Sequence, residues 1–111
     1  MGRTNRISMS LVHKELPSAA FLSKCLSDEN RLRILLFLKN GKKSVSQIVE
    51  ELHLSQPLVS HHLKELKRSL LVKIERNGPF IYYEVTDGKV IDIIAELAVL
   101  AKELLAGRKV F

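Results

Sequence analysis

The stretch that most constrains the fold runs from Leu54 to Leu66 and reads LSQPLVSHHLKEL. Apolar residues recur through it at intervals of four, three and four positions, which places them on one face of a helix. These residues are Val59, Leu63, Leu66 and Leu70. Ser55 can cap the start of this helix, and Pro57 fits its first turn, where a missing N–H costs nothing. The pattern predicts an amphipathic helix over residues 55–69.

The opposite face of this predicted helix is polar and consists of Gln56, Ser60, His61, Lys64 and Arg68. Small polar donors near the N-terminus, with cations further along, suit a helix that reads the major groove of DNA. We expect the first three to contact base edges and the last two to meet phosphates, which add affinity without sequence information. Ser55 can also approach a phosphate, because helix N-termini favour anions. The alternative is a polar face that only meets water.

The positive charge of the chain is concentrated around this helix. The 111 residues carry 18 Lys and Arg against 12 Asp and Glu, a formal net charge of +6. Residues 31–78 hold ten of the basic and four of the acidic residues, so the whole excess lies there. This distribution favours a polyanionic partner. A basic surface that only maintains solubility is the alternative.

Composition and length indicate one folded domain. The chain is long enough for one core but not for two, and 46% hydrophobic residues predict folding rather than disorder. The single cysteine, Cys25, excludes an internal disulfide and a CxxC pair. No apolar run approaches the roughly 20 residues of a membrane span, and no secretory signal stands out, so we expect a cytoplasmic protein. We expect a flexible arm over residues 1–15 and a single domain over residues 16–111.

Three more helices are predicted before residue 55, over residues 16–26, 28–40 and 45–53. The second begins at an acidic first turn, is apolar nearly all round and closes at Asn40-Gly41, so we expect it in the middle of the domain. Ser44 or Ser46 can cap the third. Its short connection to helix 55–69 predicts a helix-turn-helix.

A β-hairpin over residues 71–86 is predicted next, with its turn at Arg76-Asn77-Gly78-Pro79. A hairpin directly after a recognition helix is the wing of a winged helix, and a terminal helix over residues 88–106 follows it. The fold class is therefore mainly α with a small β-hairpin, a winged helix-turn-helix. Arg76 and Asn77, at the tip of the wing, are placed to approach the backbone or minor groove of DNA. The alternative is an ordinary solvated turn.

The terminal helix carries more apolar surface than one small core can cover. Apolar positions alternate along it at intervals of four and three, the spacing of an interhelical seam; these are Val90, Ile94, Leu97, Ala101 and Leu104. This surplus of apolar surface predicts a protein partner, most simply a second copy of the chain across a two-fold axis. Leu22, on helix 16–26, is expected to join this interface. The alternative is a helix sunk into its own domain.

The order of these elements resembles the ArsR/SmtB family of winged-helix repressors. The likeness is carried by residues 26–35 (LSDENRLRIL), 54–66 and 81–85 (IYYEV). The resemblance implies a homodimer that binds double-stranded operator DNA and releases it when an inducer arrives, often a metal ion and sometimes a redox signal. Two recognition helices in successive major grooves, about 34–36 Å apart, read a near-palindromic site.

The chain departs from the metal-sensing members of that family. The cysteine motif that some members carry on the third helix falls here on residues 44–47 (SVSQ), and residues 88–111 contain neither His nor Cys. Carboxylates alone make a poor site for zinc, nickel or copper. We therefore expect no metal site and no cofactor. The effector is unknown, and we expect any effector to act at the dimer interface or between the terminal helix and the DNA-binding unit.

Individual residues near the predicted helices have competing interpretations. His62 points toward the core side of its helix and is expected to be half-buried, with a hydrogen bond to backbone. We do not expect it to share a metal ion with His61, because adjacent helical residues diverge by about 100°. Cys25 is expected to be a small buried hydrophobe. Lys42 and Lys43 either touch phosphates or lie in a solvated loop.

The sequence is also compared with two other classes of function, a protein-interaction module and an enzyme. The same fold can serve as a protein-interaction module that binds DNA only non-specifically, because a fold does not dictate a function. Such a module would bind DNA weakly and lose it as salt rises. No glycine-rich phosphate loop, nucleophile–base pattern or paired carboxylates stands out. We therefore do not expect an enzyme.

Overall fold

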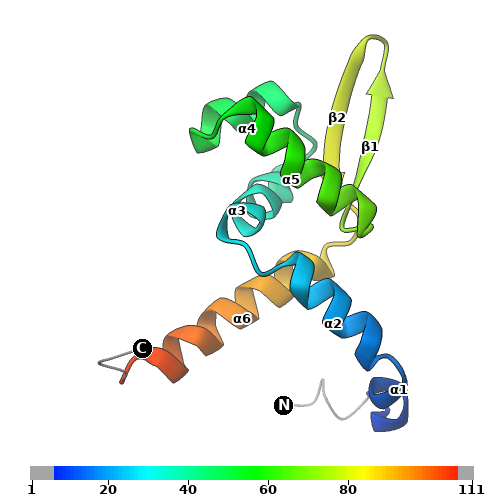
Figure 1. Cartoon of the computed structure of the whole chain (residues 1–111), viewed down its shortest axis with the longest axis vertical. Coiled ribbons are helices and arrows are strands. Elements are labelled where there is room, and N and C mark those ends of the chain that lie inside the picture. The colour runs from blue at the N-terminus through cyan, green and yellow to red at the C-terminus, as the bar shows by residue number, and fades with distance from the viewer. Residues whose placement is uncertain (1–6, 108–111) are drawn as a thin grey trace.

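The computed structural model describes residues 7–107, which form a winged helix-turn-helix with the helices α1, α2 and α6 below it (Figure 1). The elements are α1 (Met9–Lys14), α2 (Leu16–Cys25), α3 (Glu29–Phe37), the 3-10 turn η2 (Leu38–Asn40), α4 (Val45–Leu52), α5 (Gln56–Arg68), β1 (Val72–Asn77), β2 (Phe80–Val85) and α6 (Lys89–Leu105). The predicted fold class is confirmed. Helix 28–40 differs only in its last turn, which tightens into η2.

The core lies where α3, α4, α5 and the start of the hairpin meet. Side chains from all four elements are fully or almost fully buried there: Ile34, Leu35, Ile48, Val59, Leu63, Leu66 and Val72. Helix α3 occupies the middle, as predicted, although Leu36 remains 42% exposed on its outer side. Burying these side chains orients α5, because an amphipathic helix turns its apolar face to the core.

Local side-chain hydrogen bonds start each helix of the DNA-binding unit. The carboxylate of Asp28 accepts the backbone N–H groups of Asn30 and Arg31 at the start of α3, at 2.8 and 3.1 Å. Ser44, rather than Ser46, caps α4 in a reciprocal capping box with Gln47. Such caps satisfy backbone donors that a helix leaves unpaired and contribute about 1 kcal/mol each.

The wing is an antiparallel hairpin with a two-residue loop. Strand pairing runs from Val72 opposite Val85 to Asn77 opposite Phe80, which leaves only Gly78 and Pro79 in the loop. Gly78 has a φ of +65°, and the proline ring holds φ near −65°, the combination of a type II′ turn. The predicted four-residue turn was therefore too wide, since residues 76 and 77 belong to β1.

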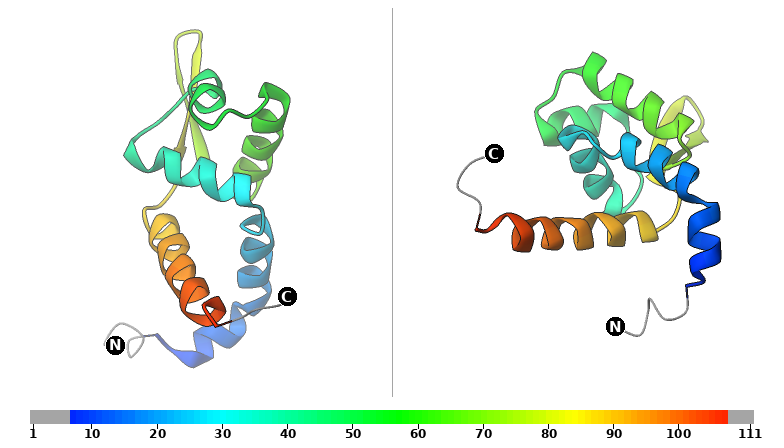
Figure 2. Two further views of the ribbon diagram at one scale, coloured as in Figure 1. Left: turned by 90° about the vertical axis from the view of Figure 1, so that its left-hand side faces the viewer. Right: turned by 60° about the horizontal axis from the view of Figure 1, so that its bottom comes forward.

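Figure 2 shows α2 and α6 on the side of the molecule away from the hairpin loop. Helix α1 joins α2 and is capped by Ser8, whose hydroxyl accepts the Leu11 N–H at 3.2 Å. The predicted flexible arm over residues 1–15 is therefore wrong for residues 9–14, because a capped helical turn forms there. Residues 1–6 of that arm lie outside the described residues.

Within residues 7–107, no helix combines the length and apolarity needed to cross a membrane.

The last predicted apolar position of the α5 face is also corrected. Helix α5 ends at Arg68, and Leu70 lies beyond it with a φ of +67° and 77% of its surface exposed. This left-handed residue turns the chain from α5 into β1. The core position that the spacing assigned to Leu70 is taken by Leu71, whose N–H donates to the Leu66 carbonyl at 2.9 Å.

Candidate nucleic-acid interface

Helix α5 divides into a buried face and an exposed polar face, as its sequence predicts. Val59, Leu63 and Leu66 are fully buried against α3 and α4. The predicted DNA-contacting side chains on the other face are all exposed: Gln56, Ser60, His61, Lys64 and Arg68. The core therefore holds the helix at a fixed rotation and presents these donors and cations together.

The first turn of α5 carries polar donors without an acidic residue. Ser55 is the N-cap, and its hydroxyl accepts the backbone N–H of Leu58 at 3.3 Å. Pro57 lies in the first turn, as predicted, where no intrahelical N–H is required. The partial positive charge of this helix end is thus uncancelled by a local carboxylate. This end suits a phosphate, the second role expected of Ser55.

The cations of α5 differ in how freely they can meet a phosphate. Arg68 lies 3.6 Å from the carboxylate of Glu65, which partly neutralises it. Lys64 takes part in none of the ion pairs found within residues 7–107. Lys67 was not among the predicted contact residues, but it is exposed seven residues after Ser60 and extends the same polar face. Its position at i+3 from Lys64 was the signal available in the sequence.

The wing presents the other two predicted contact residues. Arg76 and Asn77 are exposed at the far end of β1, next to the Gly78–Pro79 loop, which projects beyond the rest of the molecule (Figure 1). Phe80, on the paired strand, is 61% exposed at the same end. The wing therefore carries a cation, an amide and an aromatic ring at its tip.

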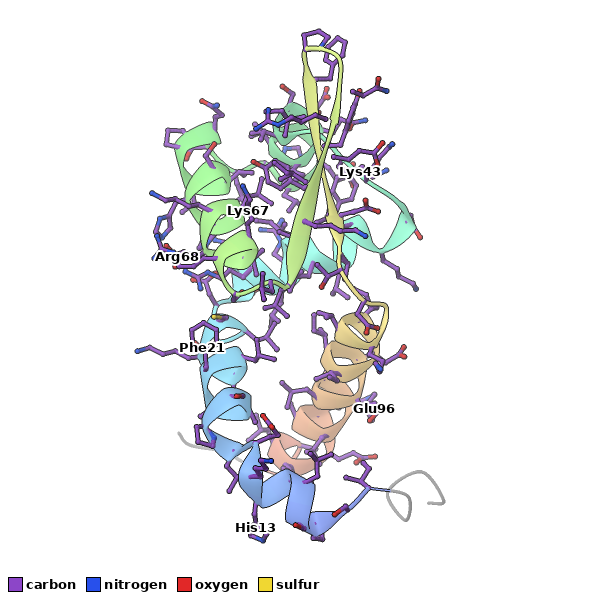
Figure 3. The ribbon with its side chains drawn as sticks, turned by 90° about the vertical axis from the view of Figure 1, so that its right-hand side faces the viewer. His13, Phe21, Lys43, Lys67, Arg68 and Glu96 are labelled. Carbon is purple, nitrogen blue, oxygen red and sulfur yellow. The ribbon has the colours of Figure 1, made fainter. Side chains whose placement is uncertain are left out.

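Lys42 and Lys43, left open between two roles, are both engaged with the wing or the core. The Lys42 ammonium lies 2.6 Å from the carboxylate of Glu75 and 5.6 Å from the ring centre of Tyr82. The hydrogen bond to Glu75 raises the pKa of Lys42. Lys43 covers the Phe37 ring at 5.1 Å. Figure 3 places Lys67 and Arg68 on α5, and Lys43 on the other side of the hairpin.

His62 is buried, with 5% of its surface exposed. The prediction that its ring bonds to the backbone is wrong. Its Nδ1 instead accepts the Nε–H of Arg31 at 3.1 Å, and its Nε2 lies 3.7 Å from a carboxylate oxygen of Asp28. Arg31 belongs to α3 and Asp28 caps its start, and both are distant in sequence from His62. No local pattern in the sequence pairs residues 31 positions apart, so this contact was missed.

The predicted dimer seam on α6 is corrected by the packing of that helix. Ile94 is 5% exposed and belongs to its own core, against which Val90 is also packed. Four of the exposed apolar residues of α6 instead form a neighbouring stripe at intervals of four, three and four, here named the α6 stripe: Ile93, Leu97, Leu100 and Leu104. Val99 and Leu105 are also exposed but lie off this line. Of the other predicted interface residues, Leu22 is 38% exposed and Ala101 is half-buried.

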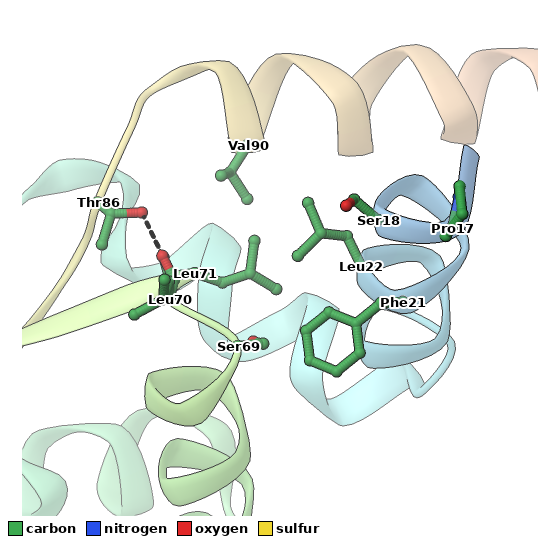
Figure 4. A pocket seen from close by; sticks show the side chains of 9 residues that line it. All are labelled: Pro17, Ser18, Phe21, Leu22, Ser69, Leu70, Leu71, Thr86 and Val90. Carbon is green, nitrogen blue, oxygen red and sulfur yellow. Dashed lines mark hydrogen bonds between the residues drawn. The ribbon is translucent and has the colours of Figure 1, made fainter. Parts of the chain in front are cut away.

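An open apolar cavity of about 580 Å³ lies between α2, the end of α5 and the start of α6 (Figure 4). Its walls include Phe21, Leu22, Leu71 and Val90. The hydroxyl of Thr86, also in the wall, donates to the Leu70 carbonyl at 2.8 Å.

Within the described residues, no three His, Cys, Asp or Glu side chains gather as a metal site would require. Cys25 is half-buried, as a small hydrophobe near a core would be.

Comparisons with known proteins agree on one family. A family model described as "Bacterial regulatory protein, arsR family" matches residues 28–73. An uncharacterised HTH-type transcriptional regulator of Methanocaldococcus jannaschii is 40% identical over 77 residues, which span 68% of this chain and 86% of that protein. The transcriptional repressor SdpR of Bacillus subtilis is 40% identical over 62 residues, 56% of this chain and 69% of that protein.

A solved structure extends the likeness to nearly the whole chain. It is the homodimeric winged helix-turn-helix DNA-binding domain of a possible ArsR-family transcriptional regulator from Mycobacterium bovis. The two chains superpose with a TM-score of 0.73 and 28% sequence identity, over 89% of this chain and 92% of that one. The match includes elements outside the family model, since residues 28–73 leave out β2 and α6.

Proposed function

The chain belongs to the arsR family of bacterial regulatory proteins, and from this premise we propose that it is a homodimeric repressor of transcription. It is a DNA-binding regulator of the winged helix-turn-helix class, and the family consists of regulators rather than enzymes. The proposal concerns the finer points: repression, the dimer, a near-palindromic operator and release by an effector.

The observation that carries the proposal is the two-sided construction of α5. Three fully buried residues fix its rotation, while Gln56, Ser60 and His61 are exposed together with Lys64 on the outer face. Amide, hydroxyl and imidazole groups can donate to or accept from base edges in the major groove. We assign these three side chains to base reading. Lys64, Arg68 and Ser55 are assigned to phosphates, and Arg76 and Asn77 to the DNA beside the wing.

The α6 stripe supports the dimer. Four large apolar residues lie exposed along one line of this helix, although a small soluble domain rarely leaves such a row uncovered. A second copy related by a two-fold axis would cover both rows at once, because each copy presents the same surface. We assign Leu22, which lines an apolar pocket together with Ile93, and Ala101 to the same interface. The homodimeric M. bovis relative, with a similar fold, supports the same arrangement.

Such a dimer presents two copies of α5 to DNA. Two-fold symmetry in the protein is matched by a near-palindromic operator whose half-sites lie about one helical turn apart. A repressor of this kind occupies its operator in the cytoplasm until a ligand favours another relative placement of the two helices. The apolar cavity between α2, α5 and α6 lies where the DNA-binding unit meets α6, the region in which we expect an effector to act.

The test is fluorescence anisotropy with DNA from upstream of the protein's own gene and with scrambled DNA. The double substitution Ser60→Ala and His61→Ala should abolish the preference for upstream DNA and leave the oligomeric state unchanged. The matched control is Ser10→Ala with His13→Ala, the same exposed residue types on α1. This control should keep the preference.

The competing function predicts a different pattern in the same assay. A protein-interaction module would bind both DNAs equally and lose both as salt approaches about 150 mM, because non-specific binding depends steeply on salt. A preference that persists at that salt supports the operator-reading regulator. A preference that survives the Ser60 and His61 substitutions would contradict the assignment of base reading to α5.

A further inference from the structure

Arg31 lies at a junction of three helices. Its Nε–H donates to Nδ1 of His62, on α5, at 3.1 Å. One of its terminal nitrogens also donates to the backbone carbonyl of Cys25, the last residue of α2, at 3.4 Å. Arg31 itself belongs to α3. One guanidinium group thus ties the recognition helix to α3 and to the end of α2.

His62 completes this cluster from the buried side of α5. Its Nδ1 can accept the Arg31 N–H only when it carries no proton, so the neutral ring must hold its proton on Nε2. Nε2 faces the carboxylate of Asp28 at 3.7 Å. The Asp28 carboxylate is held in place by the backbone N–H groups that it caps at the start of α3.

We propose that Arg31 and His62 are positioning residues for α5, and that operator reading requires the neutral imidazole of His62. The inference rests on the proposed function, in which α5 reads the operator. Neither residue is assigned a DNA contact, because His62 is buried and Arg31 is half-buried. They act on the operator only through the placement of the helix that carries Gln56, Ser60 and His61.

The physical argument is that apolar packing and hydrogen bonds constrain a helix differently. The buried leucine and valine contacts of α5 are non-directional, so they resist separation from the core more strongly than small shifts along it. The Arg31–His62 hydrogen bond is directional and joins one point on α5 to one point on α3. Losing it leaves the Asp28 carboxylate, 3.7 Å from Nε2 of His62, as the polar side chain that still faces α5 from the start of α3.

Protonation of His62 breaks its hydrogen bond with Arg31. A proton on Nδ1 sets an N–H against the N–H of Arg31, so two donors face each other and the bond is lost. The added charge also lies beside the guanidinium cation. Asp28 opposes this effect from α3. On α5 itself, His61 lies with its ring centre 5.5 Å from that of His62, and half-buried Glu65 lies one turn further on.

The direction of the pKa agrees with this requirement. Burial lowers the pKa of His62 below its ordinary 6.5, the Asp28 carboxylate opposes the lowering, and Arg31 and His61 add to it. His62 is therefore neutral at neutral pH, with the hydrogen bond in place. Because the folded-state pKa lies below the unfolded one, the stabilisation is present above about pH 6.5 and is lost as pH falls through the lowered value.

The experiment measures the preference for upstream DNA, defined as the ratio of the affinities for upstream and scrambled DNA. Acid pH strengthens non-specific binding to both DNAs, and taking the ratio cancels most of this effect. For the wild-type dimer we expect full preference at about pH 7.5 and a loss of about tenfold as the pH falls below about 6.5 and through the lowered pKa of His62. His62→Asn keeps an acceptor near the position of Nδ1 but removes the titrating ring, so its preference should fall clearly less than that of the wild-type dimer over the same range. His13→Gln, which removes an exposed histidine on α1, should keep the wild-type fall.

A second measurement does not depend on any variant folding. The imidazole signals of wild-type His62 are followed by NMR across the same pH range, and the loss of preference should follow the titration of this ring. A preference that stays constant while His62 titrates would overturn the inference and leave the proposed function intact. Wild-type protein without any preference at about pH 7.5 would overturn the proposed function, and this inference with it.

Discussion

Replacing Lys64 with Gln isolates one phosphate contact of the proposed interface. Lys64 is exposed on the polar face of α5 and takes part in none of the ion pairs found among the described residues. Its ammonium group is therefore available to neutralise a phosphate without giving up a protein partner. Glutamine has a similar helix propensity and a side chain only one atom shorter, but it carries no charge.

The magnitude follows from counterion release. Each neutralised phosphate contributes about 0.9 to the slope of log K against log salt concentration on double-stranded DNA. A dimer presents Lys64 twice, so the Lys64→Gln dimer should lose about 1.8 from that slope. The loss should be similar on upstream and scrambled DNA, because phosphates carry no sequence information.

The matched control is Lys42→Gln, also a single exposed lysine of the basic region. Lys42 already pairs with Glu75 at 2.6 Å, so its removal uncovers a carboxylate rather than a phosphate contact. We expect a change in slope well below that of the Lys64→Gln dimer. The assay is anisotropy with both DNAs over a salt series. Equal slopes for wild-type and Lys64→Gln protein would refute the assignment, and so would equal losses in the two variants.

Three further predictions concern the scaffold that presents this face. Leu63→Ala should lower the free energy of unfolding by about 2–5 kcal/mol in urea, because it empties a fully buried site. The control Leu58→Ala, at a position 36% exposed on the same helix, should lower it by less than about half as much. Leu97→Lys with Leu104→Lys should convert the dimer to monomer in sedimentation and leave the helical circular dichroism unchanged, and a persistent dimer would exclude the α6 stripe. Ser44→Ala should lower the free energy of unfolding by about 1 kcal/mol, and no loss would contradict the capping box as a stabilising contact.

Local signals explain why so much of this fold can be predicted from sequence. Ser55 and Pro57 place the start of α5 within one residue, and the Asn-Gly-Pro run places the hairpin. These signals act over a few residues and need no knowledge of the rest of the chain. The exposed face of α5 follows from the same periodicity, because burying Leu63 on one side leaves Ser60 outside.

The predictions that failed depend on contacts between distant segments. The α6 spacing identifies an apolar arc but cannot say which part its own core covers, and packing against the rest of the protomer buries Ile94 and leaves Leu97 51% exposed. For Lys42 the sequence left two roles open, and its partner Glu75, 33 residues away, is brought near only by the position of the wing. Short-range patterns cannot rank such pairings, because many residues of suitable charge are available.

The sequence by itself determined the winged helix-turn-helix class, the residues on the outer face of α5 and the concentration of positive charge around them. Periodicity, caps and turn residues are local properties, and the charge is a simple sum over the chain. Only the tertiary structure decided that His62 is held by Arg31 of α3 and that Ile93, rather than Ile94, faces outward on α6. The reason is physical: burial and pairing are properties of the packed chain, and they arise only when helices distant in sequence meet.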